Sequence, residues 1–246
     1  MFVAEDDYCK SYYYRGAADN WLDFAGFYWR IVRINGDGSI RLIYSGTKDN
    51  NTGSFTHITT SSYNTRKNQE KYADYKISTI KNVVDNWYKT NILDKGYDNK
   101  IADTGYCNDM SKKTPSYFGA YDRLWNNKTP TLKCPDKASD LLSKGNNKLT
   151  YPVGLLTLDE GSFAGGTTNS SNKNYYLYTG EGHWTMTPAN WGGDPVTVGS
   201  VDFHEGYLFV SASVQNLNGA RPVLSLKSNV LVTSGDGTLS SPYVIN

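Results

Sequence analysis

The sequence predicts an α+β protein, and three observations lead to this fold class. Residues 27–44 have the pattern of a β-hairpin, residues 78–93 have that of an amphipathic helix, and short apolar runs separated by turn residues fill the chain from residue 175 onward. The 246 residues contain neither an internal repeat nor a clear linker. We therefore expect one domain over residues 1–246, with residues 1–11 as a lead-in segment.

The hairpin has the strongest local signal. Its turn is Asn-Gly-Asp-Gly at residues 35–38, where glycine tolerates a positive φ angle. Apolar and basic side chains alternate on both sides of this turn. In this pattern Arg30, Arg33 and Arg41 line one polar face of the hairpin.

Two segments are predicted to be helical from their periodicity and start signals. Ser78 is an expected N-cap, and apolar side chains follow it at helical spacing as far as residue 93. A shorter helix is expected between Asp136 and Lys144.

A capping box predicts one more helix. Thr157 and Glu160 have the required spacing, so we expect a short helix to begin at Thr157 and to run toward Ala164. Two glycines at residues 165–166 end it. Asp159 and Glu160 are a candidate pair of catalytic carboxylates for glycoside hydrolysis, but their place in a capping box explains both without catalysis.

The remaining chain is assigned to strands and loops. The expected strands are residues 152–156, 175–179, 183–187, 196–203, 206–213, 220–227 and 229–233. Long loops are expected over residues 45–75 and 95–148, the second with aromatic islands at residues 117–121 and 125–127.

Composition argues against two classes of protein. The net charge is only +1, whereas a nucleic-acid binder needs clustered positive charge. No apolar run reaches the length of about 18 residues that a membrane-spanning helix requires, so we expect no transmembrane segment. Aromatic residues make up 14% of the chain, which favours a folded protein whose core is rich in rings.

The three cysteines predict one disulfide. Cys107 and Cys134 lie in polar, turn-rich surroundings, and we expect them to pair; three reduced thiols are the alternative. No C-x-x-C spacing supports a zinc or redox site. Cys9 is then free or bonded to a group outside the chain.

The expected disulfide also bears on location. The chain begins without the basic and apolar segments of a signal peptide. One interpretation is a cytosolic protein. We prefer the other, in which a leader or anchor is absent from this sequence and the protein is secreted or held at the cell surface, because disulfides persist in oxidising compartments.

Several segments, in their order along the chain, resemble a known group of proteins. They are FYWRIV at residues 27–32, VGLLTLDE at 153–160, HWTMTP at 183–188, GARPVLSL at 219–226, and the ending GDGTLSSPYVI at 235–245. These segments resemble bacterial extracellular domains with a C-type-lectin-like fold, related to the formylglycine-generating-enzyme group and to retroelement-diversified receptors. They especially resemble uncharacterised surface proteins of gut Firmicutes.

The resemblance implies both a fold and a class of function. It implies small twisted antiparallel sheets with about two helices and long irregular loops. Members of this fold mostly bind proteins or glycans, so we expect a secreted or cell-surface module of the adhesin or receptor kind that binds a protein or glycan ligand without enzymatic activity. The alternatives are an enzyme of unknown type on the same scaffold, or a structural subunit of a pilus or phage tail tip.

We expect no metal and no cofactor. Calcium-dependent sugar binding of the animal-lectin kind needs an E-P-N or Q-P-D tripeptide and W-N-D, and the nearest match is Trp-Asn-Asn at residues 125–127. The turn at residues 35–39 is a poor calcium loop, because its twelfth position is Gly46 and not glutamate. Cys107 and Cys134 lie well before the late β region where the copper-binding cysteines of formylglycine-generating enzymes are expected.

Catalysis has little support in the sequence. The three histidines are His57, His183 and His204, which is a small number for acid–base chemistry, and no spacing connects one of them to a cysteine nucleophile. We interpret the histidines as surface residues. Trp184 and Arg221 are expected to be buried structural residues.

The candidate ligand-binding residues lie in the turns between the late strands, because loops on a rigid scaffold carry function. They offer stacking, charge and hydrogen bonding, and they are Asn190, Trp191, Asp194, His204 and Asn216. A wider aromatic set nearby, half of which is expected to pack the sheet, contains Tyr175, Tyr176, Tyr178, Phe203 and Tyr207.

Overall fold

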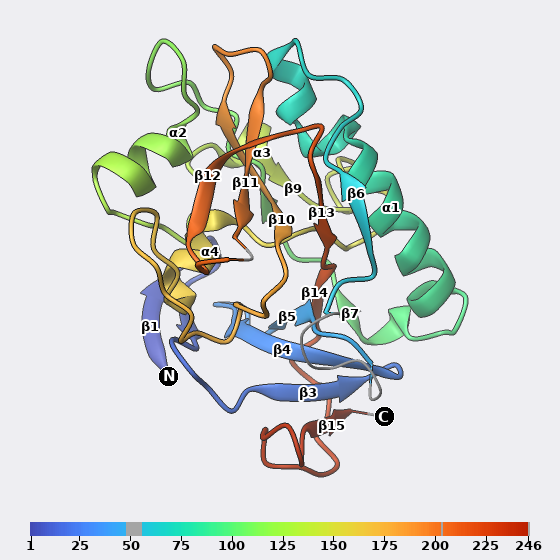
Figure 1. The fold of residues 1–246 in the computed structure, drawn as a ribbon. Coiled ribbons are helices and arrows are strands. Elements are labelled where there is room, and N and C mark those ends of the chain that lie inside the picture. Colours follow the sequence, from blue (N-terminus) through green and yellow to red (C-terminus); the bar gives the residue numbers. More distant parts are fainter. Residues whose placement is uncertain (48–55, 203, 246) are drawn as a thin grey trace.

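The computed structural model describes residues 1–47, 56–202 and 204–245. The architecture is α+β, as the sequence predicts: two large sheets are accompanied by four α-helices within the described residues (Figure 1). In Figure 1 the sheet that contains the N-terminal strands lies at the bottom and the second sheet stands above it. One continuous cluster of buried apolar side chains is shared by both.

The lower sheet contains eight strands in the described chain. Six follow the order β1-β2-β4-β5-β14-β7, while β3 pairs with β4 and with β15. Their bounds are β1 Phe2–Glu5, β2 Lys10–Tyr13, β3 Trp21–Phe24, β4 Phe27–Ile34, β5 Ile40–Tyr44, β7 Ile101–Ala102, β14 Val223–Leu226 and β15 Tyr243–Ile245.

The predicted hairpin is confirmed as β4 and β5. The two strands pair antiparallel, and the Asn35 amide donates to the Ser39 carbonyl at 2.8 Å across the turn. Gly38 has a φ of +83°, which explains the need for glycine there.

The N-terminal segment departs from the expectation of a lead-in. Residues 2–5 form β1, which pairs with β2 from Phe2 opposite Tyr13 to Glu5 opposite Lys10. Three of the four β1 residues are exposed, so the sequence shows no alternation of buried and exposed positions that would predict this strand.

The upper sheet has the order β12-β11-β10-β13-β6. Its strands are β6 Thr59–Ser62, β10 His183–Asn190, β11 Thr197–Val201, β12 Leu208–Ser213 and β13 Leu217–Ala220, and a small separate pair is formed by β8 Tyr106–Cys107 and β9 Leu141–Leu142. Because β10, β11 and β12 are antiparallel, the connections 191–196 and 214–216 lie at one end of the sheet and the connection 202–207 at the other.

The described α-helices are α1 Thr79–Tyr88, α2 Gly119–Tyr121, α3 Lys137–Asp140 and α4 Leu158–Ala164, and wider π-helical turns continue α1 over Lys89–Leu93 and α2 over Asp122–Asn126. Shorter 3₁₀ turns lie at Glu70–Ala73, Tyr75–Ile77 and Asp98–Lys100. The Ser78 hydroxyl accepts a hydrogen bond from the Lys81 amide at 3.1 Å, which confirms the predicted N-cap of α1.

The helix α4 also follows its sequence signals. Thr157 and Glu160 form the reciprocal capping box, and Gly165 ends the helix with a φ of +118°. A left-handed residue at this position is a common way to end a helix, and glycine adopts it without a side-chain clash.

Three predicted strands are wrong. Residues 152–156 are buried but form only a single bridge, from Gly154 to Val223, because a short apolar run is equally compatible with a buried extended segment. Residues 175–179 form a turn, and residues 229–233 form no strand, with Leu231 79% exposed.

Two expected structural residues are confirmed in the core. Trp184 is fully buried, and its indole N–H donates to the Ser61 carbonyl at 2.8 Å. Arg221 is also buried and donates to the carbonyls of Tyr44 and Leu177 at 2.9 and 3.1 Å. In the part of the chain that the structure describes, no helix is long and apolar enough to cross a bilayer.

Candidate functional site

The predicted disulfide is present between Cys107 and Cys134. It joins β8 to the irregular segment that follows residue 130, and it closes a loop with a sequence separation of 27 residues. Cys9 is exposed and is not part of a disulfide.

A cluster of buried charges lies next to this disulfide. Arg33 and Arg41 extend from β4 and β5 and both contact the same carboxylate oxygen of Glu160, at 3.2 and 3.3 Å. Arg33 also pairs with Asp6 at 2.7 Å. The sequence predicts that Arg30, Arg33 and Arg41 line one polar face of the hairpin. In the structure all three are buried, because acidic and amide side chains of other segments supply partners for their guanidinium groups.

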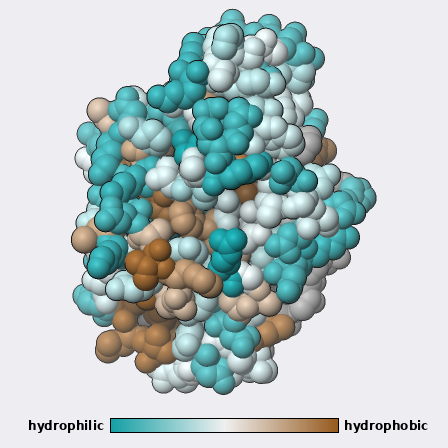
Figure 2. All heavy atoms as spheres, turned by 90° about the vertical axis from the view of Figure 1, so that its left-hand side faces the viewer, coloured by the Kyte–Doolittle hydropathy of each residue, from teal (hydrophilic) through white to brown (hydrophobic). Residues whose placement is uncertain are grey.

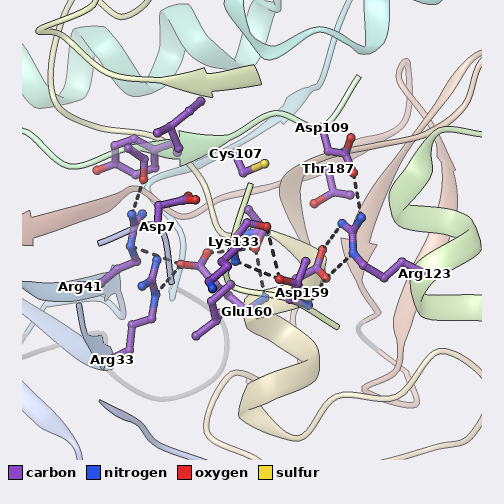
Figure 3. A pocket seen from close by; sticks show the side chains of 16 residues that line it. Asp7, Arg33, Arg41, Cys107, Asp109, Arg123, Lys133, Asp159, Glu160 and Thr187 are labelled. Carbon is purple, nitrogen blue, oxygen red and sulfur yellow. Dashed lines mark hydrogen bonds and ion pairs between the residues drawn. The ribbon is translucent and has the colours of Figure 1, made fainter. Parts of the chain in front are cut away.

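Arg123 forms the second half of the cluster. Its guanidinium donates to both carboxylate oxygens of Asp159, at 2.8 and 2.7 Å, and to Asp109 at 2.9 Å. Figure 3 shows Arg33 and Arg41 reaching Glu160 from one side while Arg123 reaches Asp159 from the other. Glu160 and Asp159, both in the first turn of α4, thus connect this helix to the lower sheet and to the segment after α2.

The space between these groups is small and its charges are matched. The cavity has a volume of about 30 Å³, which accommodates about two water molecules. Burial disfavours the ionised form of Glu160, but the charges of Arg41 and Arg33 outweigh burial and hold its pKa below the usual range. We interpret this cluster as a structural junction, since its charges already neutralise one another.

A much larger hollow, the aromatic groove, has a volume of about 500 Å³ and lies between α2, the loop at residues 168–171 and β12. Its first wall consists of Tyr117, Tyr121 and Trp125. The Tyr117 and Tyr121 rings are stacked, with centroids 3.8 Å apart and planes 13° from parallel, and the Trp125 ring follows at 6.1 Å and 22°. Trp125 is 39% exposed.

Helical spacing explains why two of these rings share a wall. Tyr121 and Trp125 are four residues apart along α2 and its π-helical turn, and residues four apart lie on the same side of a helix. Tyr117 lies just before α2 and stacks on Tyr121.

Phe118 and Leu124, next to these rings in the sequence, are buried in the core. Arg123 lies in the same segment and forms an ion pair with Asp159 of α4. This ion pair links the aromatic wall to the buried charged cluster.

The opposite wall is polar and also fixed. Residues 168–171 are Thr-Asn-Ser-Ser, and Ser211 of β12 adds another hydroxyl. Thr168 donates to the Leu124 carbonyl at 3.3 Å, which links the two walls. The Asn172 amide group donates to the Gly165 carbonyl at 2.7 Å and joins the end of this loop to the end of α4.

The groove belongs to elements at the left of Figure 1, and Figure 2 shows the molecule from that side. Hydrophilic and neutral residues occupy most of the upper half of this face. Apolar residues gather in the lower half, at the height at which β1 lies in Figure 1.

The five residues predicted to bind ligand are distributed over two ends of the upper sheet. Asn190, Trp191 and Asp194 lie at the end of β10 and in the connection to β11, and Asn216 lies in the connection at that same end. His204 is exposed in the connection 202–207, at the opposite end of β11. A strand of this length separates the two ends by about 17 Å, so the five do not surround one ligand site.

Trp191 already has a neighbour on its ring. The side chain is half-buried, and the Lys112 ammonium lies 4.6 Å from the ring centroid. The Trp191 amide donates to the Ser116 carbonyl at 2.9 Å, which ties this turn to the segment before Tyr117. In the wider set, Tyr175 and Tyr176 are buried and Phe203 lies outside the described residues, whereas Tyr207 lines the aromatic groove.

The expectation of three surface histidines is wrong for His183. It is 1% exposed on the central strand β10, and burial, followed by the charge of Arg221, holds its pKa well below the usual range. His57 is half-buried and contacts Glu181 at 2.9 Å. Within residues 1–47, 56–202 and 204–245, no group of three or more His, Cys, Asp and Glu side chains is arranged to hold a metal ion.

Sequence reasoning missed the aromatic wall although its signal is visible. Tyr117, Tyr121 and Trp125 recur at intervals of four, but the glycine at residue 119 and the surrounding polar residues favoured a loop. The polar wall at residues 168–171 is a separate segment, and its approach to the rings has no local signature.

Comparisons with protein-family models, with curated proteins and with solved structures found no match to this chain.

Proposed function

We propose that this protein is a non-enzymatic binding module whose ligand is a glycan, held in the aromatic groove. The observation that carries the proposal is the pairing of three stacked rings with a wall of hydroxyl and amide side chains. A sugar ring has an apolar face of C–H groups, which packs on an aromatic ring, and an edge of hydroxyl groups, which need hydrogen-bond partners. The groove offers both kinds of partner.

The size and order of the groove support the same proposal. A volume of about 500 Å³ lies within the range of small-molecule sites, roughly 300–1,000 Å³. Its walls are fixed by the hydrogen bonds of Thr168 and Asn172 and by the ion pairs of Arg123. A wall that is already ordered loses little conformational freedom when a ligand binds.

The lining residues favour binding over catalysis. Glycoside hydrolysis generally requires two carboxyl groups at the scissile bond, and general acid–base catalysis requires a titratable group near neutral pH. The described residues that line the groove are Tyr, Trp, Thr, Asn, Ser and Leu, without a carboxylate or histidine. This composition supports recognition of the ligand without chemical change.

The fold and the location are proposed on the sequence resemblance. Mostly antiparallel sheets, two principal helices in α1 and α4, and irregular segments such as residues 127–136 and 165–182 support a C-type-lectin-like fold. The Cys107–Cys134 disulfide supports a secreted or cell-surface protein, because such bonds persist in oxidising compartments.

A glycan array with the purified protein tests the proposed function. The wild type should bind a defined set of glycans, and Trp125→Ala should weaken this binding by about 2 kcal/mol, or roughly 30-fold, because it removes an exposed stacking ring. Tyr12→Ala is the matched control, since Tyr12 is an exposed ring on β2, outside the groove. Equal binding by Trp125→Ala and the wild type would show that the aromatic groove is not the ligand site. Binding only to proteins stripped of their glycans would show that the ligand is not a glycan.

A further inference from the structure

A second hollow, the basic pocket, lies beside the aromatic groove. It has a volume of about 280 Å³. Its walls carry two cationic side chains, three hydroxyl groups and apolar surface, from Arg15, Lys128, Ser162, Thr167, Thr168, Leu124 and Phe163. None of the described residues that line it is acidic.

The two cations have no acidic partner in the described structure. Arg15 and Lys128 are both exposed, and neither takes part in an ion pair between described residues. The Lys128 ammonium donates to the Thr168 hydroxyl at 3.2 Å, a neutral acceptor that leaves its charge uncompensated. This contrasts with the neighbouring buried cluster, in which Arg33, Arg41 and Arg123 all face carboxylates.

The end of α4, which borders the basic pocket, does not need these cations. The carbonyls of Gly161 and Ser162 accept hydrogen bonds from the Gly166 and Gly165 amides, at 2.9 and 3.1 Å. The Ala164 carbonyl accepts from a backbone amide of the segment before β3, at 2.9 Å. These three carbonyls, which would otherwise attract a lysine or arginine, are therefore already satisfied.

Lys128 occupies a backbone conformation that favours other residues. Its φ is +56°, in the left-handed region where asparagine and glycine are preferred. Backbone strain of this kind is found preferentially at functional sites. The Lys128 ammonium contacts Thr168, at the rim that the two hollows share at Thr168 and Asn169.

The basic pocket is within reach of a ligand in the aromatic groove. The Lys128 ammonium lies 5.4 Å from the centroid of the Trp125 ring, the outermost ring of the aromatic wall. A sugar that packs against Trp125 would therefore present its substituents, or the next sugar, to Lys128 and Arg15. Arginine and lysine bind carboxylates through charge-assisted hydrogen bonds, which are stronger than those between neutral groups.

We propose that the ligand is an acidic glycan, whose carboxylated sugar places its carboxylate between Arg15 and Lys128 while a neighbouring part of the chain packs on the aromatic wall. This inference rests on the proposed function, and it adds the chemical class of the ligand. The basic pocket provides charge selectivity, and the aromatic groove provides stacking that does not depend on charge.

The test uses pairs of glycans that differ only in the charged group: an oligogalacturonate and its methyl ester, and sialyllactose and its methyl ester. Calorimetric titration of the wild type should show about tenfold tighter binding of the acidic member of at least one pair. This preference should decrease as the salt concentration rises, because salt screens exposed charges.

The double variant Arg15→Gln/Lys128→Asn should lose the preference and bind both members of the pair with equal affinity. Asparagine suits the left-handed backbone at this position, so the variant should keep the thermal stability of the wild type. Arg66→Gln/Lys95→Asn is the matched control, because Arg66 and Lys95 are also exposed and form no ion pair between described residues. It should retain the preference.

The outcomes separate the two proposals. Equal binding of the acidic and neutral members by the wild type overturns the acidic ligand. A preference that survives in Arg15→Gln/Lys128→Asn overturns the basic pocket as the site that binds the carboxylate. Both outcomes leave the glycan-binding groove in place. Absence of binding to every glycan, acidic and neutral, overturns both.

Discussion

At the scale of single residues, Glu160 carries out two structural tasks with one carboxylate. One oxygen accepts from the Thr157 amide at 2.9 Å and closes the capping box, and the other faces Arg33 and Arg41. An isolated buried arginine is costly, so the two guanidiniums depend on this acid. The same residue therefore determines where α4 begins and where the hairpin packs against it.

Replacing Glu160 with glutamine isolates the role of its charge. Glu160→Gln keeps the size of the side chain and an oxygen that can accept the hydrogen bond from the Thr157 amide. It removes the negative charge that Arg33 and Arg41 face. We therefore expect the free energy of unfolding to fall by about 3 kcal/mol or more in urea denaturation at pH 7. Glu70→Gln is the control, because Glu70 forms only an exposed pair with Lys112 and its loss should cost less than about 1 kcal/mol. Equal stability of Glu160→Gln and the wild type would contradict the account of the buried cluster.

The same carboxylate makes stability depend on pH. The pKa of Glu160 in the folded protein lies below the value of 4.5 for an unperturbed glutamate. A depressed folded-state pKa contributes stability that is fully present above about pH 4.5 and is lost as the pH falls through the folded-state value. Unfolding measured from pH 6 to about pH 3 should show a steeper loss in the wild type than in Glu160→Gln. Parallel profiles would show that the charge of Glu160 is not involved.

At the scale of elements, the structure joins α2 and its π-helical turn to distant parts of the chain. Arg123 anchors this segment to Asp159 of α4, and the Thr168 hydroxyl bonds to the Leu124 carbonyl from the polar wall. The disulfide between Cys107 and Cys134 closes the part of the chain that contains α2. The groove is thus built from irregular segments whose positions are fixed by covalent and charged contacts.

Removal of this disulfide should lower the free energy of unfolding by about 3.5 kcal/mol. The bond joins residues 27 positions apart, and without it the unfolded chain gains conformational entropy. Urea unfolding of Cys107→Ser/Cys134→Ser against the wild type measures the change, and Cys9→Ser is the control. Alkylation of the unfolded, unreduced protein should label Cys9 alone. Labelling of all three cysteines in freshly purified secreted protein would contradict the pairing.

The elements that the sequence could predict are those with local signals. The hairpin turn at residues 35–38, the N-cap Ser78 and the capping box at Thr157 each involve residues a few positions apart, and all three are present. The burial of Arg33 was missed because its partner Glu160 is 127 residues away. The aromatic groove was missed for the same reason, since its two walls are distant in sequence.

At the scale of the whole molecule, the two sheets and their shared core form a scaffold that holds charged, aromatic and polar segments on one side. Arg33, Arg41 and Arg123 form ion pairs with buried carboxylates. Among the described residues, no cluster of potential metal ligands is arranged to hold an ion. Folding stability should therefore come from packing, the disulfide and the buried ion pairs.

Metal removal tests this description of the whole molecule. The melting temperature should be the same in excess EDTA and in millimolar calcium, since no group of potential metal ligands is arranged among the described residues. A decrease of many degrees in EDTA would reveal a calcium loop, with Asp194, Asp202 and Asp236 as the first acids to substitute.

The most direct test of the central claim, that the aromatic groove binds the ligand, is a two-dimensional NMR titration of the tryptophan indole N–H signals with a glycan identified on the array. The chain has 6 tryptophans, and Trp→Phe variants assign their signals. We predict that the Trp125 signal shifts progressively with ligand concentration while the Trp191 signal stays in place. A shift of the Trp191 signal with an unchanged Trp125 signal would contradict the groove and move the site to the turn between β10 and β11.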